Sequence, residues 1–246
     1  MDAKTLLSHA YAMPICAPAY HKGAPRFYNR EFLTITYRSD PEAVRRWVPE
    51  PLKVTDPIVK FEVIHMPDSE GIGDYYESGQ IIQVEHEGKV GGLTHMMYLD
   101  SMTGTIAGRE MWGFPKKLGF PGISVEYDNL VGKLDIGKTR VATATMGYKY
   151  DRKDLAEAKR GTESASNFLL KVLPHVDGSL RVCELVKYPL TDVVMKGAWT
   201  GPGALSYVPH ALAPFADLPV LEVLSANHMV MDLTIGIGEV VHDYLA

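Results

Sequence analysis

The chain has 246 residues, of which 46% are hydrophobic and 22% charged, so it can bury a sizeable core, and its composition argues against disorder or a fibrous repeat. The net charge of -5 means that the chain has no excess of positive charge for binding nucleic acid or an anionic membrane surface. We expect no secretory signal and no membrane span, and the distant Cys16 and Cys183 do not make a disulfide scaffold, so the expected protein is reduced, soluble and cytoplasmic.

Strand patterns dominate the chain from residue 32 onward. A strand is predicted at 32–37, followed by a short helix with a capping oxygen, a proline and a capping-box Glu at 39–42, which ends near Pro49. Alternating or β-branched runs then predict strands at 58–66, 80–86, 93–99, 122–127 and 141–148. A charged surface helix is predicted at 151–160, and further strands at 168–173, 180–186 and 229–237.

Turn signals complete this pattern. Asp177-Gly178 lies between two predicted strands and predicts a hairpin, because glycine tolerates the positive φ of a tight turn. Residues 197–216 contain several prolines and glycines and are expected to form an ordered loop. Since short loops rather than helices separate most strands, we expect a mainly β (α+β) fold with antiparallel pairing. No repeat or linker divides the chain, so a single domain over residues 1–246 is expected.

Motifs for cofactor or metal chemistry do not occur in the sequence. Gly236-Ile237-Gly238 lacks the third glycine and the following helix of a dinucleotide-binding loop, and the histidines show no paired ligand spacing. There is no G-x-S-x-G elbow, and Cys183 lies in an apolar strand where a thiol is inert. We therefore expect no metal and no cofactor.

Residues 113–121 set two adjacent lysines, Lys116 and Lys117, between apolar side chains bracketed by glycine and proline. A lysine in apolar surroundings tends to lose its proton, and the neutral amine is a nucleophile for carbonyl groups. The alternative is a solvated turn that carries two cations. Arg30, Glu62 and Glu77 also stand in otherwise apolar segments, although each taken alone is more often a surface charge.

Taken together, these segments resemble the acetoacetate decarboxylase family, and the resemblance spans almost the whole chain. The pieces that carry it, in order, are YNRE at 28–31, VKFEVIHM at 59–66, ESGQ at 77–80, HMMYLD at 95–100, GRE at 108–110, PKKLG at 115–119, VATATMGYK at 141–149 and AWTGP at 198–202. No single piece would be enough, but their number and order are hard to explain otherwise.

The resemblance implies an acetoacetate decarboxylase-like domain folded as an antiparallel β-barrel-like cone with a few peripheral helices. It implies a large homo-oligomer, dodecamers being known in the family, and no cofactor. It also implies that Lys116 forms a Schiff base with a small β-keto acid, releasing carbon dioxide and acetone from acetoacetate. Lys117 is then the neighbouring lysine, and Arg30, Glu62 and Glu77 are the polar residues of the pocket.

How the amine of Lys116 is kept neutral is a separate question, and this family is the usual example of a lysine activated beside another cation. If Lys116 and Lys117 are extended, their side chains leave on opposite faces. Two charges about 12 Å apart, at an effective dielectric constant of about 20, repel by only roughly 1.4 kcal/mol. Burial by walls such as Met97, Phe114 and Leu118 is therefore expected to dominate, unless the segment bends so that both amines point inward.

The roles of the polar residues follow from their charges. We expect Arg30 to orient the substrate, Glu77 to position it or to disfavour its carboxylate by repulsion, and Glu62 to hold Arg30. Two other functions remain open. A Schiff-base aldolase or dehydratase acting on a pyruvate-like keto acid would form the same adduct without releasing carbon dioxide from acetoacetate. A non-catalytic barrel that carries a small apolar ligand would form no adduct.

Overall fold

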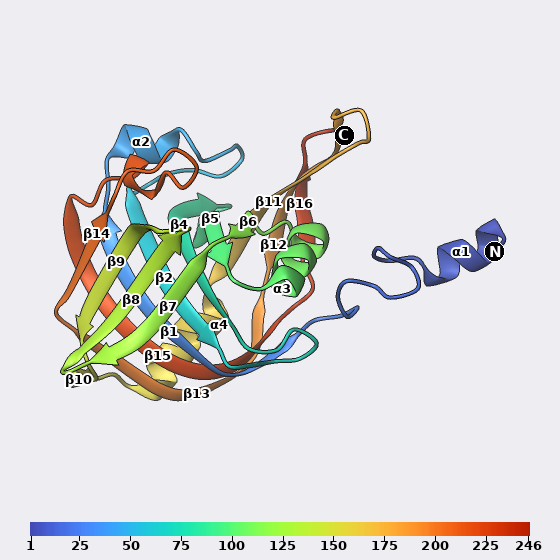
Figure 1. Cartoon of the computed structure of the whole chain (residues 1–246). Coiled ribbons are helices and arrows are strands. Elements are labelled where there is room, and N and C mark those ends of the chain that lie inside the picture. The colour runs from blue at the N-terminus through green and yellow to red at the C-terminus, as the bar shows by residue number, and fades with distance from the viewer.

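Two β-sheets carry the fold, in a computed structural model that describes every residue from Met1 to Ala246 (Figure 1). The larger, 12-stranded sheet contains β1 (Arg26–Arg38), β2 (Ile58–Met66), β3 (Asp68–Ser69), β4 (Tyr75–His86), β5 (Lys89–Leu99), β6 (Lys116–Leu118), β10 (Asp151–Arg152), β11 (Ser166–Pro174), β12 (Leu180–Tyr188), β13 (Leu190–Gly201), β15 (Glu222–Ile235) and β16 (Glu239–Asp243). The smaller sheet contains β7 (Phe120–Glu126), β8 (Asn129–Ile136), β9 (Thr139–Gly147) and β14 (Gly203–Tyr207).

The strand order confirms the expected mainly β class. The larger sheet runs β10-β13-β15-β1-β2-β4-β5-β11-β12-β16, with β3 paired to β1 and β6 paired to β5, and the smaller sheet runs β14-β9-β8-β7. Strand pairing is antiparallel except where β5 pairs with β11 and with β6. The pairings form two sheets with free ends rather than one closed barrel, and Figure 1 shows the strands of the larger sheet wrapping around the smaller one.

A separate hydrophobic core lies on each face of the larger sheet, because successive residues of a strand point to opposite faces. Leu33 and Val63 point toward the smaller sheet, where Gly132 of β8 lies so close that a side chain there would touch both. Phe32 and Ile64 point the other way, into a second core that also contains residues of β11, β12 and the segment before β6. The second core contains the candidate site described below.

Helices are few and short. They are α1 (Ala3–His9), α2 (Pro41–Arg45), α3 (Met102–Ala107), the π-helical turn η1 (Gly108–Trp112), α4 (Leu155–Ser164) and the 3₁₀ turn η2 (Phe215–Asp217). The helix predicted after residue 39 is α2, and the Asp40 carboxylate accepts a hydrogen bond from the Ala43 amide at 2.8 Å. The second predicted helix is present and has no buried residue, but it begins later, after the cap Asp154. None of the helices is long and apolar enough to cross a membrane.

The prediction of a loop over 197–216 is wrong for its first half, which contains the end of β13 and the whole of β14. Its glycines serve close packing rather than turns. A Cβ on Gly203 would lie 2.4 Å from the Cβ of Ala226, and one on Gly197 would lie 2.2 Å from the Trp199 ring. Glycine inside a strand often marks such a close approach, which a sequence pattern does not distinguish from a turn. The hairpin at Asp177-Gly178 is confirmed, with Gly178 at φ +85° between β11 and β12.

Candidate active site

Strand register brings the polar residues of three neighbouring strands to one face of the larger sheet. Glu62 on β2 pairs with Thr34 on β1 and Gly79 on β4, and Ile64 pairs with Phe32 and Glu77. Directly paired residues share a face, and so do residues two apart on a strand. Arg30, Glu62 and Glu77 therefore line the same cavity, a convergence that spacing in the sequence does not show.

Lys116 reaches the site from β6, which lies on the other side of β5 from β4. It is the first residue of β6, which pairs in parallel with β5, so that Lys116 lies opposite Met97, and Met97 lies opposite Gly79. The side chain of Lys116 is only 7% exposed. Its Nζ lies 4.9 Å from the centre of the Phe114 ring and donates a hydrogen bond of 3.3 Å to the carbonyl oxygen of Gly104 in α3. The amine is thus held in a largely apolar place by one backbone carbonyl and one carboxylate.

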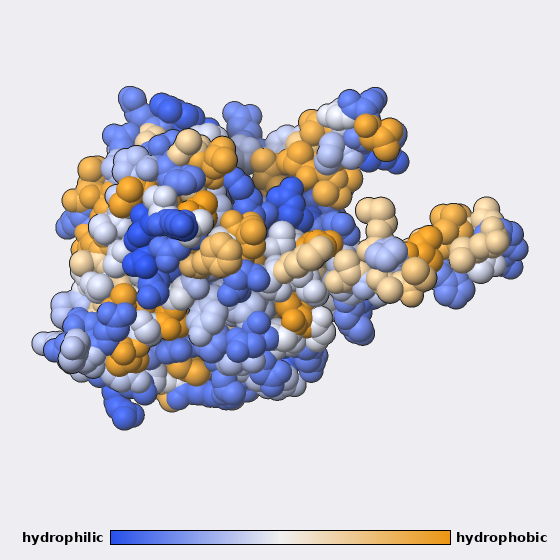
Figure 2. All heavy atoms as spheres, in the orientation of Figure 1, coloured by the Kyte–Doolittle hydropathy of each residue, from blue (hydrophilic) through white to orange (hydrophobic).

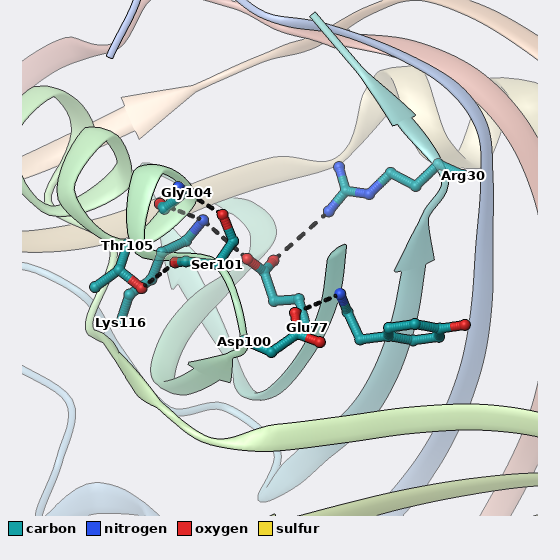
Figure 3. A network of polar contacts seen from close by, with 8 residues as sticks. Arg30, Glu77, Asp100, Ser101, Gly104, Thr105 and Lys116 are labelled. Carbon is teal, nitrogen blue, oxygen red and sulfur yellow. Dashed lines mark hydrogen bonds and ion pairs between the residues drawn. The ribbon is translucent and has the colours of Figure 1, made fainter. Parts of the chain in front are cut away.

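That carboxylate is Glu77, which stands between two cations (Figure 3). Lys116 Nζ lies 2.8 Å from Glu77 Oε2, and Arg30 Nη2 lies 3.8 Å from Glu77 Oε1. The guanidinium carbon of Arg30 lies over the rings of Phe27 and Phe32, at 5.0 and 4.8 Å from the two ring centres. The side chains of Arg30 and Glu77 are 8% and 3% exposed. Burial of an ion pair is costly unless its geometry is good, so this arrangement is typical of a functional site.

Glu62 supplies a second carboxyl group with a different electrostatic environment. Burial raises the pKa of Glu62, and the positive charges of Lys60 and Arg30 oppose that effect without overcoming it. The negative charge of Glu77 adds to the rise in the pKa of Glu62. Glu62 therefore keeps its proton to higher pH than an ordinary glutamate does.

Two cavities meet at Glu77. One, of about 260 Å³, contains Lys116 and is walled by apolar side chains that include Ile72 and Trp112. The other, of about 360 Å³, contains Arg30, Glu62, Met97 and Tyr188. Glu77, Phe114 and Ile235 line both cavities. A small molecule with a carbonyl group at one end and an anionic group at the other would find an amine and a guanidinium on the two sides of Glu77.

The model of the family described as "Acetoacetate decarboxylase (ADC)" matches residues 12–245. The chain belongs to this family. A protein from Paraburkholderia xenovorans (strain LB400) named acetoacetate decarboxylase is 59% identical over 245 residues, which cover 100% of this chain and 97% of the relative. A solved structure of an acetoacetate decarboxylase superposes with a TM-score of 0.96 at 46% identity, covering 100% of both chains. The acetoacetate decarboxylase of Legionella pneumophila superposes with a TM-score of 0.92 at 45% identity, covering 98% of this chain and 97% of that chain.

The structure brings together most of the side chains that the family resemblance implied. Met97 and Phe114 are buried walls, as expected. Leu118 was also expected to be a wall, and this was wrong, because its side chain is 67% exposed. β6 is an edge strand that pairs only with β5, so its other side has no neighbouring strand to cover Leu118.

Lys117 lies outside the site. Its Nζ donates a hydrogen bond of 2.8 Å to the Leu212 carbonyl and lies 5.5 Å from the centre of the Tyr98 ring, and the residue is exposed. It lines neither of the two cavities at Glu77. The expectation that adjacent extended lysines leave on opposite faces is confirmed, and the alternative in which both amines point inward is not what the fold adopts.

Sequence reasoning missed the helical segment that covers the lysine. α3 begins at the cap Ser101, whose Oγ accepts from the Gly104 amide at 3.0 Å, and it continues into η1 (Figure 3). A signal was present in Ser101, a favoured helix cap. The segment after it is short and contains Gly104 and Gly108, which lower helix propensity and conceal the helix.

Proposed function

We propose that the chain is an acetoacetate decarboxylase that converts acetoacetate to acetone and carbon dioxide through a Schiff base on Lys116. The observation that carries this proposal is the buried amine of Lys116, held 2.8 Å from Glu77 in a cavity that adjoins Arg30. Membership of the acetoacetate decarboxylase family and relatives of that name at more than half identity support the same activity.

In its neutral form the amine of Lys116 attacks the ketone carbon of the substrate, and loss of water gives a protonated imine. The bond between the α-carbon and the carboxylate then breaks, carbon dioxide leaves, and the electron pair moves into the carbon–nitrogen system to form an enamine. The enamine carbon takes up a proton, and water hydrolyses the resulting imine to release acetone and the free amine. The protonated imine is the electron sink, so the chemistry calls for neither a metal nor a cofactor.

Each polar residue has a role that its position supports. Arg30 pairs with the substrate carboxylate, since it is the buried guanidinium on the far side of Glu77 from Lys116. Glu77, the carboxylate between the two cations, positions the substrate, and its negative charge disfavours the substrate carboxylate nearby, which promotes the departure of carbon dioxide. Glu62 helps to hold Arg30. Lys117 acts on the site only through its distant charge.

We also propose that this single-domain chain works as a cytoplasmic homo-oligomer, a dodecamer by the family resemblance. The N-terminal segment supports assembly: Figure 2 shows it projecting from the body with apolar residues along it. Leu7 and Met13 are 79% and 75% exposed, and α1 buries no residue. A helix of this length is not stable alone in water, so a second copy of the chain is expected to cover it.

The activity is tested by incubating the purified protein with acetoacetate and measuring carbon dioxide and acetone together. We expect Lys116→Ala to reduce both to the uncatalysed rate. Lys138→Ala is the matched control, because Lys138 is exposed in the turn between β8 and β9, and this variant should retain full activity. Retention of activity in Lys116→Ala would refute the assignment. A borohydride-trapped adduct without gas release would instead favour aldolase or dehydratase chemistry.

A further inference from the structure

The π-helical turn η1 lies directly against the reactive lysine, and the proposed mechanism gives it no role. The amides of Gly113 and Phe114 both donate to the carbonyl oxygen of Gly108, at 2.9 and 3.0 Å, which closes the wide turn. Gly113, at φ +91°, ends it. π-helical turns are rare and frequently occur at functional sites. The turn is formed by the GRE segment, 108–110, and the two residues that follow.

Gly108 is the point at which this turn contacts Lys116. A Cβ added to Gly108 would lie 2.7 Å from Cδ of Lys116, 2.8 Å from Cε and 3.1 Å from Nζ. Real Cβ atoms essentially never approach other heavy atoms to less than 3.0 Å, so any other residue would displace the lysine side chain. The lysine therefore lies across the bare backbone of Gly108, with its amine directed at the Gly104 carbonyl one helical turn earlier.

The next two residues fix the surroundings of the same lysine. Arg109 Nη1 donates a hydrogen bond of 3.1 Å to the carbonyl oxygen of Lys116, which ties the main chain of the lysine to the turn. Glu110 Oε2 accepts a hydrogen bond of 2.9 Å from the hydroxyl of Tyr20, a buried residue that lines the cavity of Lys116. One short turn thus holds the stem of the lysine, its backbone and one wall of its cavity.

We propose that Gly108 is a positioning residue, and that Arg109 assists it, in aiming the amine of Lys116 at the substrate carbonyl. The inference rests on the proposed function, because it concerns the same amine. Because residue 108 has no side chain, Lys116 can extend across the turn, past Phe114 and the Gly104 carbonyl, to Glu77. A methyl group at 108 would force the amine away from Glu77 and from the carbonyl that it attacks.

The test compares Gly108→Ala with Gly122→Ala in the full chain. At Gly122 in β7, an added Cβ would make an ordinary contact at 3.6 Å with Lys133, far from the site, so this control should match the unsubstituted protein. We expect Gly108→Ala to lower kcat for acetoacetate by about a hundredfold, the loss typical of a misplacement near 1 Å, with a much smaller change in KM. The rate of borohydride trapping with acetone should fall by the same factor.

Unchanged kcat and trapping rate in folded Gly108→Ala would overturn the inference. If Gly108→Ala does not fold, Arg109→Leu at the exposed neighbour takes its place, with an expected loss in kcat of about tenfold that Arg109→Lys partly restores. Equal kcat in both Arg109 variants and the unsubstituted chain would then count against it. If the unsubstituted protein releases no carbon dioxide, the proposed function fails, and acetone trapping still decides whether Gly108 positions the amine.

Discussion

Replacing Lys117 by methionine separates two explanations of how the neighbouring amine becomes reactive. In one, the cation of Lys117 drives the proton from Lys116, and in the other, burial does so. Lys117 is exposed on the opposite side of β6, and its ammonium is held by the Leu212 carbonyl, whereas Lys116 is buried. Methionine has nearly the length of lysine and removes the charge, together with the hydrogen bond to the Leu212 carbonyl on the face away from Lys116.

The geometry sets the size of the expected effect. Two lysine side chains that extend from opposite faces of a strand place their charges about 12 Å apart. At an effective dielectric constant of about 20 the two ammonium groups then repel by roughly 1.4 kcal/mol, which changes the protonation equilibrium of Lys116 by about a factor of ten. Because Lys117 is exposed, salt near physiological strength, with a Debye length of about 8 Å, weakens the repulsion further. A solvated cation at this distance supplies only a small part of the decrease, from an ordinary lysine pKa of about 10.4, that keeps an amine neutral.

The assay is the pH dependence of kcat/KM for acetoacetate, recorded at low and at high salt. Loss of a nearby cation favours the ammonium of Lys116, so the acid limb should move toward higher pH, by less than about one unit at low salt and by less still at high salt. Lys138→Met serves as the control for loss of an exposed lysine. Movement of the acid limb by several units in Lys117→Met would show that the neighbouring cation, and not burial, activates the amine.

Two further changes test the site and the fold. Glu77→Gln should lower carbon dioxide release far more than imine trapping, because it removes the one carboxylate between Arg30 and Lys116, and equal losses in the two assays would contradict its proposed role. Burial lowers the pKa of His95 from its ordinary 6.5 to about 4, so the neutral ring favours the folded state fully above pH 6.5. This stability is lost as the pH falls toward 4, by about 3 kcal/mol. In His95→Gln the free energy of unfolding by urea should fall correspondingly less over that range, and an unchanged pH dependence would contradict the assignment.

Local patterns were sufficient where a residue's surroundings are set by its own strand. The bounds of β2 match the predicted strand at 58–66, because alternation and β-branched residues run along its whole length. The same period-two rule separated Lys116 from Lys117. These are properties that a strand carries by itself.

Local patterns could not predict that the side chains of the site come together. The 2.8 Å contact of Glu77 with Lys116 depends on the register of β4 on β5 and of β5 on β6, which joins residues far apart in sequence. The contact with the Gly104 carbonyl is made by the main chain, so no side chain in the sequence indicates it. The helix that contains this carbonyl was not predicted, because its glycines lower the helix propensity of the segment. The exposure of Leu118 likewise does not follow from the alternation of β6, because Lys116, two residues earlier, is buried.

Reduction with borohydride in the presence of acetoacetate, followed by peptide mapping, tests the central claim most directly. The account predicts a single modified residue, Lys116, carrying the reduced product-derived adduct, with Lys117 unmodified in the same peptide. Modification of Lys117 or of another lysine, or no adduct while carbon dioxide is released, would contradict it.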